Sequence, residues 1–352
     1  MKKTVNTIFF VRANKTKHGG AENYLHRLSE LLTKKNINHE IINSIFPKFL
    51  PSWLRVILFN LQVCLFRDSK FYFSLERITC PDIYRAGDGV HKVFLKTQNK
   101  SRLNLLHPIY LFIEKQCFDN AKRIIANSKM IKKEIVDIYA IDPNKIDVIY
   151  NGINYKDMDS IQAFRKLSKE FKINKNQHFL LYVGSGFKRK GVEEFLQIVH
   201  NLKHLDLMAF VIGKEKNMRH YYALSKQLGI EDKIIFTGAR DDVDDFYSIS
   251  DIFILPTHYE PFSNVILEAM SFGNVVFTTK QNGASEVLSK NRIMETSNDF
   301  SIVKSIEKLF LDPELLEKEK NNNIRKSKEF SVDKNLSKTL DVINKVYLEG
   351  EF

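Results

Sequence analysis

The chain has 352 residues, of which 43% are hydrophobic and 27% are charged, a composition typical of folded proteins and not of disordered chains. With 54 Lys and Arg against 42 Asp and Glu, the net charge is +12, which favours anionic partners such as phosphorylated metabolites, acidic membranes or nucleic acid. The length exceeds one ordinary core and predicts two domains.

The cysteines and the N-terminal sequence indicate in which cellular compartment the protein is expected. Cys64, Cys80 and Cys117 are odd in number and lack metal-ligand spacing, so we expect reduced thiols, without a disulfide framework or a structural zinc. The apolar stretch at 8–11 is too short for a signal peptide and predicts a buried strand. No segment offers about 18 uninterrupted apolar residues. These features predict a cytoplasmic protein.

In the first half of the chain, short apolar strands are separated by helical patterns. A strand at 7–11 is followed by a polar loop that reaches Gly19 and Gly20, and then by an amphipathic helix. Strand, glycine turn and helix are the opening of a βαβ unit. We expect the further strands at 40–42, 71–75, 123–126 and 147–150.

The segment 46–73 departs from this alternation. Residues 52–66 are apolar nearly all round and predict a helix. One interpretation is a helix buried between layers of a domain. The other is a helix lying in the plane of a membrane surface, with Trp53 in the interface and cations on anionic head groups, namely Lys48, Arg55 and Arg67.

The second half repeats the alternation more regularly. Apolar strands are expected at 178–183, 207–212, 233–236, 252–255 and 275–277, and helical patterns lie between them. Continuous apolar strands alternating with helices predict a parallel sheet covered on both faces. The fold class is therefore α/β, with two doubly wound, Rossmann-like domains. We place them at 1–160 and 161–330, and we expect the last helix, in 331–352, to pack back on the first domain.

Two strand ends of the second domain carry residues suited to an anionic ligand. The first is VGSGFKRKGV at 183–192, where a glycine-containing loop after a strand leads into a helix. Free amides at a helix N-terminus favour an anion, and Arg189 and Lys190 add charge-assisted hydrogen bonds to phosphate oxygens. The order of residues differs from a Walker loop. Alternatively, the cationic turn is a solvated loop.

The second is HYEPFSNVILEAMSFGN at 258–274. Glu260 lies on a loop after a strand, Ser263 is a suitable N-cap, and Glu268 stands inside an otherwise apolar helix. A carboxylate at that position is either paired with a nearby cation or aimed at the hydroxyls of a ligand.

These motifs resemble a known family. Glu260 and Glu268, with seven residues between them, resemble the E-x7-E motif of the retaining, GT-B-fold glycosyltransferases of family 4. The stretch at 183–192 is similar to the diphosphate-binding turn of that family, and most similar to the turn of the lipopolysaccharide-core glucosyltransferases. Further similar stretches are FTGARDDV at 236–243 and the region 248–273. The resemblance implies two domains facing a cleft.

The resemblance also implies roles for residues that bind the donor. Arg189 and Lys190 would neutralise the diphosphate, Glu268 would hold the ribose hydroxyls, and Glu260 would hold the hydroxyls of the donor sugar. The remaining donor-binding positions would act mainly through their backbone: Gly19, Gly20, Gly184, Gly238, Arg240, Phe262, Ser263 and Asn264. Catalysis would involve Glu260 and, on the acceptor side, Asp88 and His91, although a plain polar turn is an equal reading of the stretch at 84–91.

We therefore expect a retaining hexosyltransferase that uses a nucleotide-diphosphate sugar, with UDP-sugars favoured, as co-substrate and needs no metal and no further cofactor. Its acceptor would be a glycan or glycolipid of lipopolysaccharide core or another surface polysaccharide. We expect a peripheral protein on the anionic inner face of the cytoplasmic membrane, without a nucleic-acid partner. The alternative is a basic nucleic-acid-binding protein without transferase activity.

Overall fold

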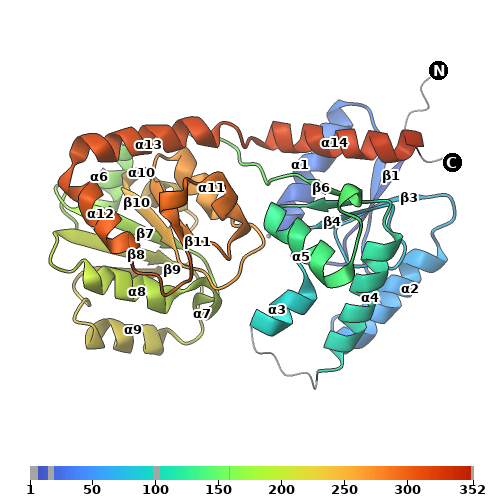
Figure 1. The fold of residues 1–352 in the computed structure, drawn as a ribbon, viewed down its shortest axis with the longest axis horizontal. Helices are drawn as coiled ribbons and strands as arrows, with labels where there is room; N and C mark the ends of the chain where they lie inside the picture. Colours follow the sequence, from blue (N-terminus) through green and yellow to red (C-terminus); the bar gives the residue numbers. More distant parts are fainter. Residues whose placement is uncertain (1–6, 15–19, 98–103, 158, 350–352) are drawn as a thin grey trace. The chain divides into compact units, whose positions relative to one another are not determined.

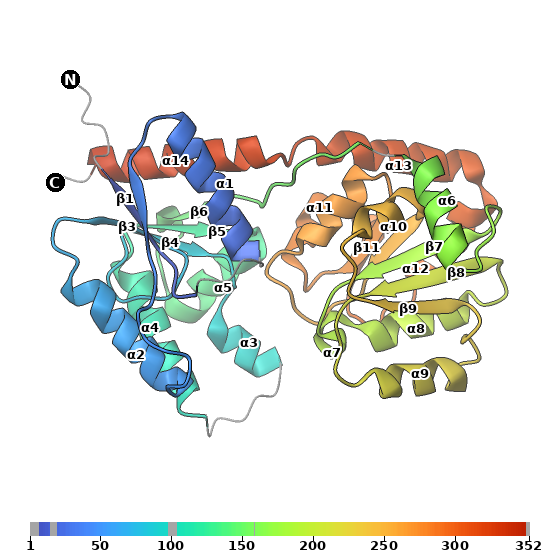
Figure 2. The same ribbon diagram turned by 180° about the vertical axis from the view of Figure 1, so that it is seen from behind.

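The computed structural model describes residues 7–14, 20–97, 104–157 and 159–349 (Figure 1). Contacts divide the chain into two compact units, one formed by residues 1–151 with 332–352 and the other by residues 152–331. Each unit contains one parallel six-stranded sheet with helices packed on it (Figure 2). The predicted α/β class with two doubly wound sheets is confirmed.

The sheet of the first unit has the strand order β2-β1-β3-β4-β5-β6. All neighbouring strands of this sheet pair in parallel. The strands are β1 (Ile8–Val11), β2 (His39–Ile42), β3 (Phe71–Ser74), β4 (Ile83–Ala86), β5 (Arg123–Ala126) and β6 (Ile146–Val148). The helices of this unit are α1 (Gly20–Lys34), α2 (Ser52–Leu65), α3 (His91–Thr97), α4 (Leu106–Asn120), α5 (Lys129–Tyr139), the 3-10 turn η1 (Pro143–Lys145) and α14 (Val332–Glu349).

The last helix of the chain completes the core of this first unit. Leu336, Leu340 and Ile343 of α14 are buried in one cluster with Phe10 of β1 and Leu28 of α1. The apolar side chains of α14 recur every three or four residues, so they form one stripe that can cover the sheet. The C-terminal helix therefore belongs to the same unit as the N-terminal strand.

Helix α2 lies at the surface of the first unit. Of its side chains, only Phe59 and Val63 are buried, whereas Leu61 is 45% exposed and Leu65 is 73% exposed. The helix packs beside α4 (Figure 2). The predicted helix is confirmed, but the interpretation of 52–66 as a helix buried between layers of a domain is wrong, because α4 and the sheet cover only one face of it.

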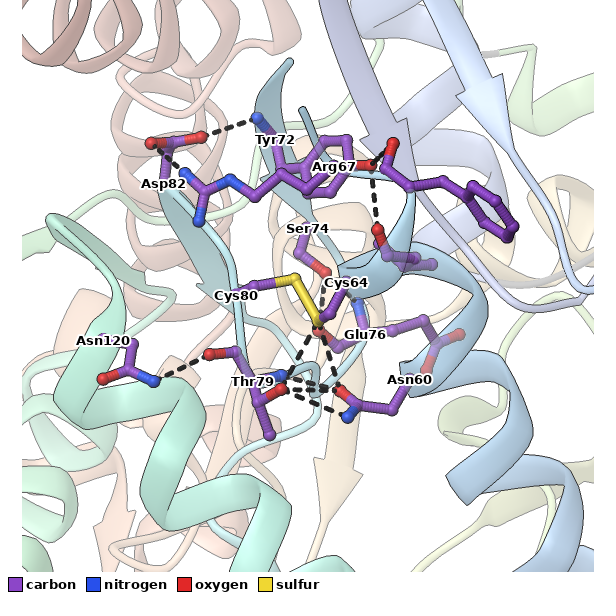
Figure 3. The surroundings of a disulfide bond; sticks show 12 residues. Asn60, Cys64, Arg67, Tyr72, Ser74, Glu76, Thr79, Cys80, Asp82 and Asn120 are labelled. Carbon is purple, nitrogen blue, oxygen red and sulfur yellow. Dashed lines mark hydrogen bonds and ion pairs between the residues drawn. A yellow bond between two sulfur atoms is a disulfide. The ribbon is translucent and has the colours of Figure 1, made fainter. Parts of the chain in front are cut away.

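One covalent link was not expected from the sequence. Cys64, near the end of α2, and Cys80, in the loop between β3 and β4, form a disulfide with their Cα atoms 5.8 Å apart (Figure 3). The backbone amide of Thr79 donates to Asn60 Oδ1 at 2.7 Å, which holds this loop against the helix. The prediction of reduced cysteines is wrong for this pair, because packing of α2 brings together two residues that are 16 positions apart. Cys117 is buried and free.

The sheet of the second unit has the order β12-β11-β10-β7-β8-β9, again with parallel neighbours. Its strands are β7 (His178–Val183), β8 (Leu207–Ile212), β9 (Ile234–Gly238), β10 (Ile252–Leu255), β11 (Val275–Thr279) and β12 (Ile293–Met294). Its helices are α6 (Ser160–Glu170), α7 (Phe187–Lys190), α8 (Val192–Asn201), α9 (Met218–Gln227), α10 (Val243–Ile249), α11 (Asn264–Ser271), α12 (Ile302–Leu311) and α13 (Pro313–Ser327), with 3-10 turns η2 (Gly283–Val287) and η3 (Lys290–Arg292).

Each sheet has a point at which the chain reverses its direction of winding. In the first unit, the chain places β2 on one side of β1 and then β3 on the other. In the second, it places β8 on one side of β7 and later β10 on the other. The loops at the carboxyl ends of two such strands diverge and leave room for a ligand, so these two points are where a site is expected.

Within the described residues, no helix combines the length and the apolar composition that crossing a bilayer requires.

Candidate functional site

The loops at the reversal point of the second sheet approach one another by their backbones. A Cβ atom on Gly213, after β8, would lie 2.1 Å from the carbonyl oxygen of Gly184, after β7. A Cβ atom on Gly191 would lie 1.9 Å from the carbonyl oxygen of Pro256, after β10, and Gly191 also has a φ of +80°. Only glycine fits such close approaches, so these positions hold the loops together at the carboxyl edge of the sheet.

Two cations of the KRK run converge on one carboxylate. Arg189 Nη1 donates to Glu260 Oε2 at 2.6 Å and to the carbonyl oxygen of Tyr259 at 2.8 Å. Lys190 Nζ lies 3.5 Å from the same Glu260 oxygen, and its stem passes over Gly184. The cluster has two positive charges and one negative charge and remains partly exposed. It therefore retains a net positive charge that is complementary to an anion.

Glu260 is fixed by its backbone. Its amide donates to the carbonyl oxygen of Gln281 at 3.0 Å, and its own carbonyl accepts from the amide of Gly283 at 2.9 Å. Between them, the fully buried Asn282 accepts from the amides of Ser263 at 3.3 Å and Ala284 at 3.1 Å. Asn282 thus holds the loop between β10 and α11 in place. Sequence reasoning missed this residue, although its Asn-Gly dipeptide is a turn signal.

Helix α11 carries the second glutamate of the motif. Phe262 and Ser263, just before the helix, are buried, and the helix begins at the half-buried Asn264. Glu268 is half-buried and accepts a hydrogen bond from the hydroxyl of Tyr247 at 3.3 Å. Burial, and then the charge of Glu268, raise the pKa of Tyr247 well above its usual value, so Tyr247 stays protonated and acts as a donor.

Gly238 is the last residue of β9, and Arg240 follows the strand at the same edge of the sheet. Gly238 has a φ of +72°, and its carbonyl oxygen accepts from the amide of Gly213 at 2.9 Å. The guanidinium of Arg240 is committed to Glu170 and Asp242, and it lies over the ring of Phe246. The hydrogen bonds that Arg240 donates to Asp242 and Glu170 raise the pKa of its guanidinium. Its side chain therefore joins α6 to the loop after β9, and its backbone is the part that a ligand can contact.

The predicted acceptor-side residues lie in the first unit. Asp88 is exposed on the loop between β4 and α3. His91 begins α3, its amide donates to Glu114 Oε1 at 2.7 Å, and its Nε2 lies 3.2 Å from His107 Nδ1. Burial, and then the positive charge of Arg77, lower the pKa of His91 to about 4, so the imidazole is neutral near pH 7.

Beside them is a network of buried charges that the sequence did not reveal. Arg12 bridges Glu22 at 2.8 Å and Glu76 at 2.9 Å. Arg77 donates to the fully buried Glu114 at 2.7 Å. Both arginines follow strands at the carboxyl edge of the sheet, at the reversal point between β1 and β3. Their partners neutralise them, so the network orders the loops of this edge.

The structure thus gathers most of the predicted donor-binding residues around one sheet edge of the second unit, with Arg189, Lys190 and Glu260 in direct contact. Asp88 and His91 belong to the other unit. Gly20 begins α1, and Gly19 lies outside the described residues. Within the described part of the chain, no group of three or more His, Cys, Asp or Glu side chains offers a metal site.

Comparison with protein families gives two matches along the chain. Residues 163–326 match the family described as "Glycosyl transferases group 1", and residues 83–157 match "Glycosyltransferase Family 4". The first match contains both glutamates and the cationic turn, and the second contains Asp88 and His91.

Among curated proteins, the chain is similar to the lipopolysaccharide glucosyltransferase WaaG of Escherichia coli K12. The two are 29% identical over 213 residues, which are 56% of this chain and 55% of that protein. In sequence, the chain spans about half the length of the first curated relatives that it matches.

Solved structures share the whole fold. The structure of WaaG, described as a glycosyltransferase involved in lipopolysaccharide biosynthesis, gives a TM-score of 0.78 at 19% identity and covers 96% of this chain and 99% of that one. The Anabaena protein HepE, solved in complex with UDP and glucose, gives 0.72 at 18% identity over 96% and 98%.

Proposed function

Because the chain belongs to the group 1 and family 4 glycosyltransferases of the GT-B fold, we propose that it moves a hexose from a nucleotide-diphosphate sugar to a glycan or glycolipid acceptor, with retention at the anomeric carbon. The observation that carries this proposal is the convergence of Arg189 and Lys190 on Glu260, beside α11 and its Glu268. UDP-sugars are favoured because the similar HepE binds UDP and glucose.

The proposed chemistry follows from the charges of this cluster. When the sugar leaves, negative charge develops on the diphosphate, and Arg189 and Lys190 stabilise it from the carboxyl edge of the sheet. These cations supply the positive charge, so the reaction as proposed needs no metal. Glu260, held by the loop that Asn282 orders, accepts hydrogen bonds from hydroxyls of the donor sugar. Glu268, oriented by Tyr247, accepts hydrogen bonds from the ribose hydroxyls.

The test of the donor site is Glu268→Ala. Loss of hydrogen bonds from ribose to a charged group costs about 1.5–3 kcal/mol, so UDP binding measured by calorimetry should weaken roughly tenfold or more, and transfer should fall in parallel. The matched control is Glu231→Ala, an exposed carboxylate in the turn before β9, which should leave both unchanged. Wild-type turnover of Glu268→Ala with every donor in a panel of UDP- and GDP-sugars would contradict the assignment.

The same panel addresses the alternative function. If RNA bound tightly while no nucleotide sugar shifted the melting temperature of the wild-type protein, nucleic-acid binding would replace sugar transfer as the proposed activity.

We further propose that the acceptor is reached at the anionic inner face of the cytoplasmic membrane, in the synthesis of lipopolysaccharide core or of another surface polysaccharide, because WaaG is a lipopolysaccharide glucosyltransferase. The apolar face of α2 supports this contact. The exposed large apolar residues of α2 and of the segments on either side of it are Ile45 (76%), Phe49 (85%), Leu61 (45%), Leu65 (73%) and Phe66 (69%).

The cations around this face complement an acidic bilayer. Lys48 is exposed beside Phe49 and pairs with no described carboxylate. Arg67, in contrast, is bound to the buried Asp82 at 2.8 Å, so it is less suited to a head group than the sequence suggested. Trp53 is half-buried, which makes Leu65 and Phe66 the better anchors.

The double variant Leu65→Ser, Phe66→Ser tests this contact. Burial of each large apolar side chain contributes about 1.5–3 kcal/mol, so binding to phosphatidylglycerol-containing vesicles in a flotation assay should weaken roughly tenfold or more. Leu311→Ser, which removes a side chain that is 77% exposed in the second unit, is the matched control and should bind like the wild type. If the double variant bound to the vesicles as well as Leu311→Ser does, the proposed membrane contact would be contradicted.

A further inference from the structure

A cavity of about 240 Å³ lies at the reversal point of the first sheet. Its walls come from the loops after β1, β2 and β3, from the first turns of α2 and from the start of α4. The volume is several times the ~30 Å³ that one water occupies in the liquid, so the cavity has room for a ligand group. Apart from the hydroxyl of Tyr110, its polar lining residues are Asn14, Ser44, Ser52, Arg55, Glu76 and Arg77.

Most charges of this wall already have partners. Glu76 accepts from Arg12 at 2.9 Å and from the amide of Ala13 at 3.2 Å. Arg77 donates to Glu114 at 2.7 Å and to the carbonyl oxygen of Gly89 at 2.8 Å. These groups hold one another in place and leave the wall nearly neutral apart from Arg55.

Arg55 is the exception. Its Nε is buried and has no hydrogen-bond partner, and the side chain pairs with no carboxylate among the described residues. The charge of Arg55 is therefore not balanced by a carboxylate of the described wall, and an anionic ligand in the cavity balances it. The fork of the guanidinium fits two oxygens of a phosphate at once.

The start of α2 adds to this positive potential. The residue at its N-cap is Pro51, no side chain caps the helix, and its first turn contains no acidic residue. Ser52 and Arg55 belong to this first turn and line the cavity, so the backbone amides of the turn are near the cavity. A helix N-terminus that is neither capped nor neutralised favours a negative charge at that position.

We propose that this cavity binds a phosphate ester carried by the acceptor, with Arg55 as the residue that contacts the phosphate oxygens. The inference rests on the proposed function, because that function makes the first unit the acceptor-binding unit.

The test is binding of glucose 6-phosphate to the full chain by calorimetry, with saturating UDP present to occupy the donor site. Arg55→Gln should weaken this binding about tenfold or more, because a hydrogen bond to a charged group is lost together with the charge. Arg55→Lys should be intermediate, since it keeps the charge and loses the fork. Uncharged glucose should bind no more tightly to the wild type than to Arg55→Gln.

Lys35→Gln is the matched control, because it removes an exposed cation of the same unit that does not line the cavity. Equal affinity of wild type and Arg55→Gln for glucose 6-phosphate, equal weakening by Lys35→Gln, or no binding of either phosphate ester by the wild type would each overturn the proposal. Dihexanoyl phosphatidic acid in place of glucose 6-phosphate distinguishes the two sources of the phosphate. Stronger Arg55-dependent binding of the lipid assigns the site to a lipid phosphate, and stronger binding of the sugar ester assigns it to a phosphorylated sugar.

The two proposals fail separately. If UDP does not bind but glucose 6-phosphate binding still depends on Arg55, the donor site is contradicted and the cavity stands as a phosphate site. If UDP binds to the wild type and more weakly to Glu268→Ala, while Arg55→Gln binds glucose 6-phosphate like the wild type, the cavity proposal alone is overturned.

Discussion

The reversal points of the two sheets have the same topology and different chemistry. In the second unit, backbones meet at Gly213 and Gly191, and Arg189 and Lys190 share one carboxylate in a partly exposed cluster. In the first unit, arginines are paired inside a buried network, and Arg77 with Glu114 is its centre. The strand order leaves room for a ligand in both units. The residues of the loops determine whether the charges there are available to a ligand or are paired with one another and order the loops.

The largest effect is expected when the buried charge network of the first unit is disrupted. Glu114 is fully buried and accepts from Arg77, from the amide of His91 and from the hydroxyl of Tyr139 at 2.5 Å. Glu114→Ala leaves Arg77 charged and unpaired, so we expect a loss of about 3–5 kcal/mol in the free energy of unfolding. Urea unfolding followed by circular dichroism measures it.

The control for this prediction is Asp119→Ala on the same helix. Asp119 forms an exposed pair with Lys115, and such surface pairs contribute about 0–1 kcal/mol. Similar losses for the two variants would show that Glu114 has no special role in the stability of the unit.

In the second unit, the corresponding change should affect turnover more than stability. Arg189→Gln removes a cation that we assign to the leaving diphosphate, and loss of one such donor lowers kcat by about 10²- to 10³-fold. Lys188→Gln, which removes an exposed cation one position earlier, should change kcat less than twofold, an effect within ~0.5 kcal/mol. A stopped assay of UDP release measures both, and equal kcat values for the two variants would refute the assigned role.

The smallest expected effect concerns pH. The pKa of His91 is lowered to about 4 by burial and then by Arg77, whereas the unfolded chain titrates near 6.5. Between these values the unfolded state binds the additional proton, so stability is complete above about pH 6.5 and falls as the pH drops towards 4. His91→Asn should show a shallower fall in melting temperature over this window. An unchanged slope would contradict the lowered pKa.

The sequence anticipated much of the second unit because its signals are local. Apolar runs bounded by glycine predicted β7, β8 and β9, and the spacing of Glu260 and Glu268 pointed to one helix and the loop before it. It did not anticipate Asn282, which acts on residues 19 positions away, or Tyr247, which orients Glu268 from another helix.

In the first unit, the expectations that failed concern contacts between distant segments. The sequence predicted the helix at 52–66 but not which face α4 and the sheet would cover, and so it left burial and surface contact open. It offered no sign that Cys64 meets Cys80, since the spacing of two cysteines carries no information about packing. The pairing of Arg77 with Glu114, 37 positions later, is of the same kind.

The sequence by itself determined the alternation of strands and helices, the parallel sheets and the motif with its two glutamates, because period, glycine placement and short spacings act over a few residues. Only the tertiary structure decided which charges are neutralised and which stay available. That choice depends on distances between side chains far apart along the chain: Arg77 pairs with Glu114, Arg189 and Lys190 share Glu260, and Arg55 lines a cavity without a carboxylate partner among the described residues.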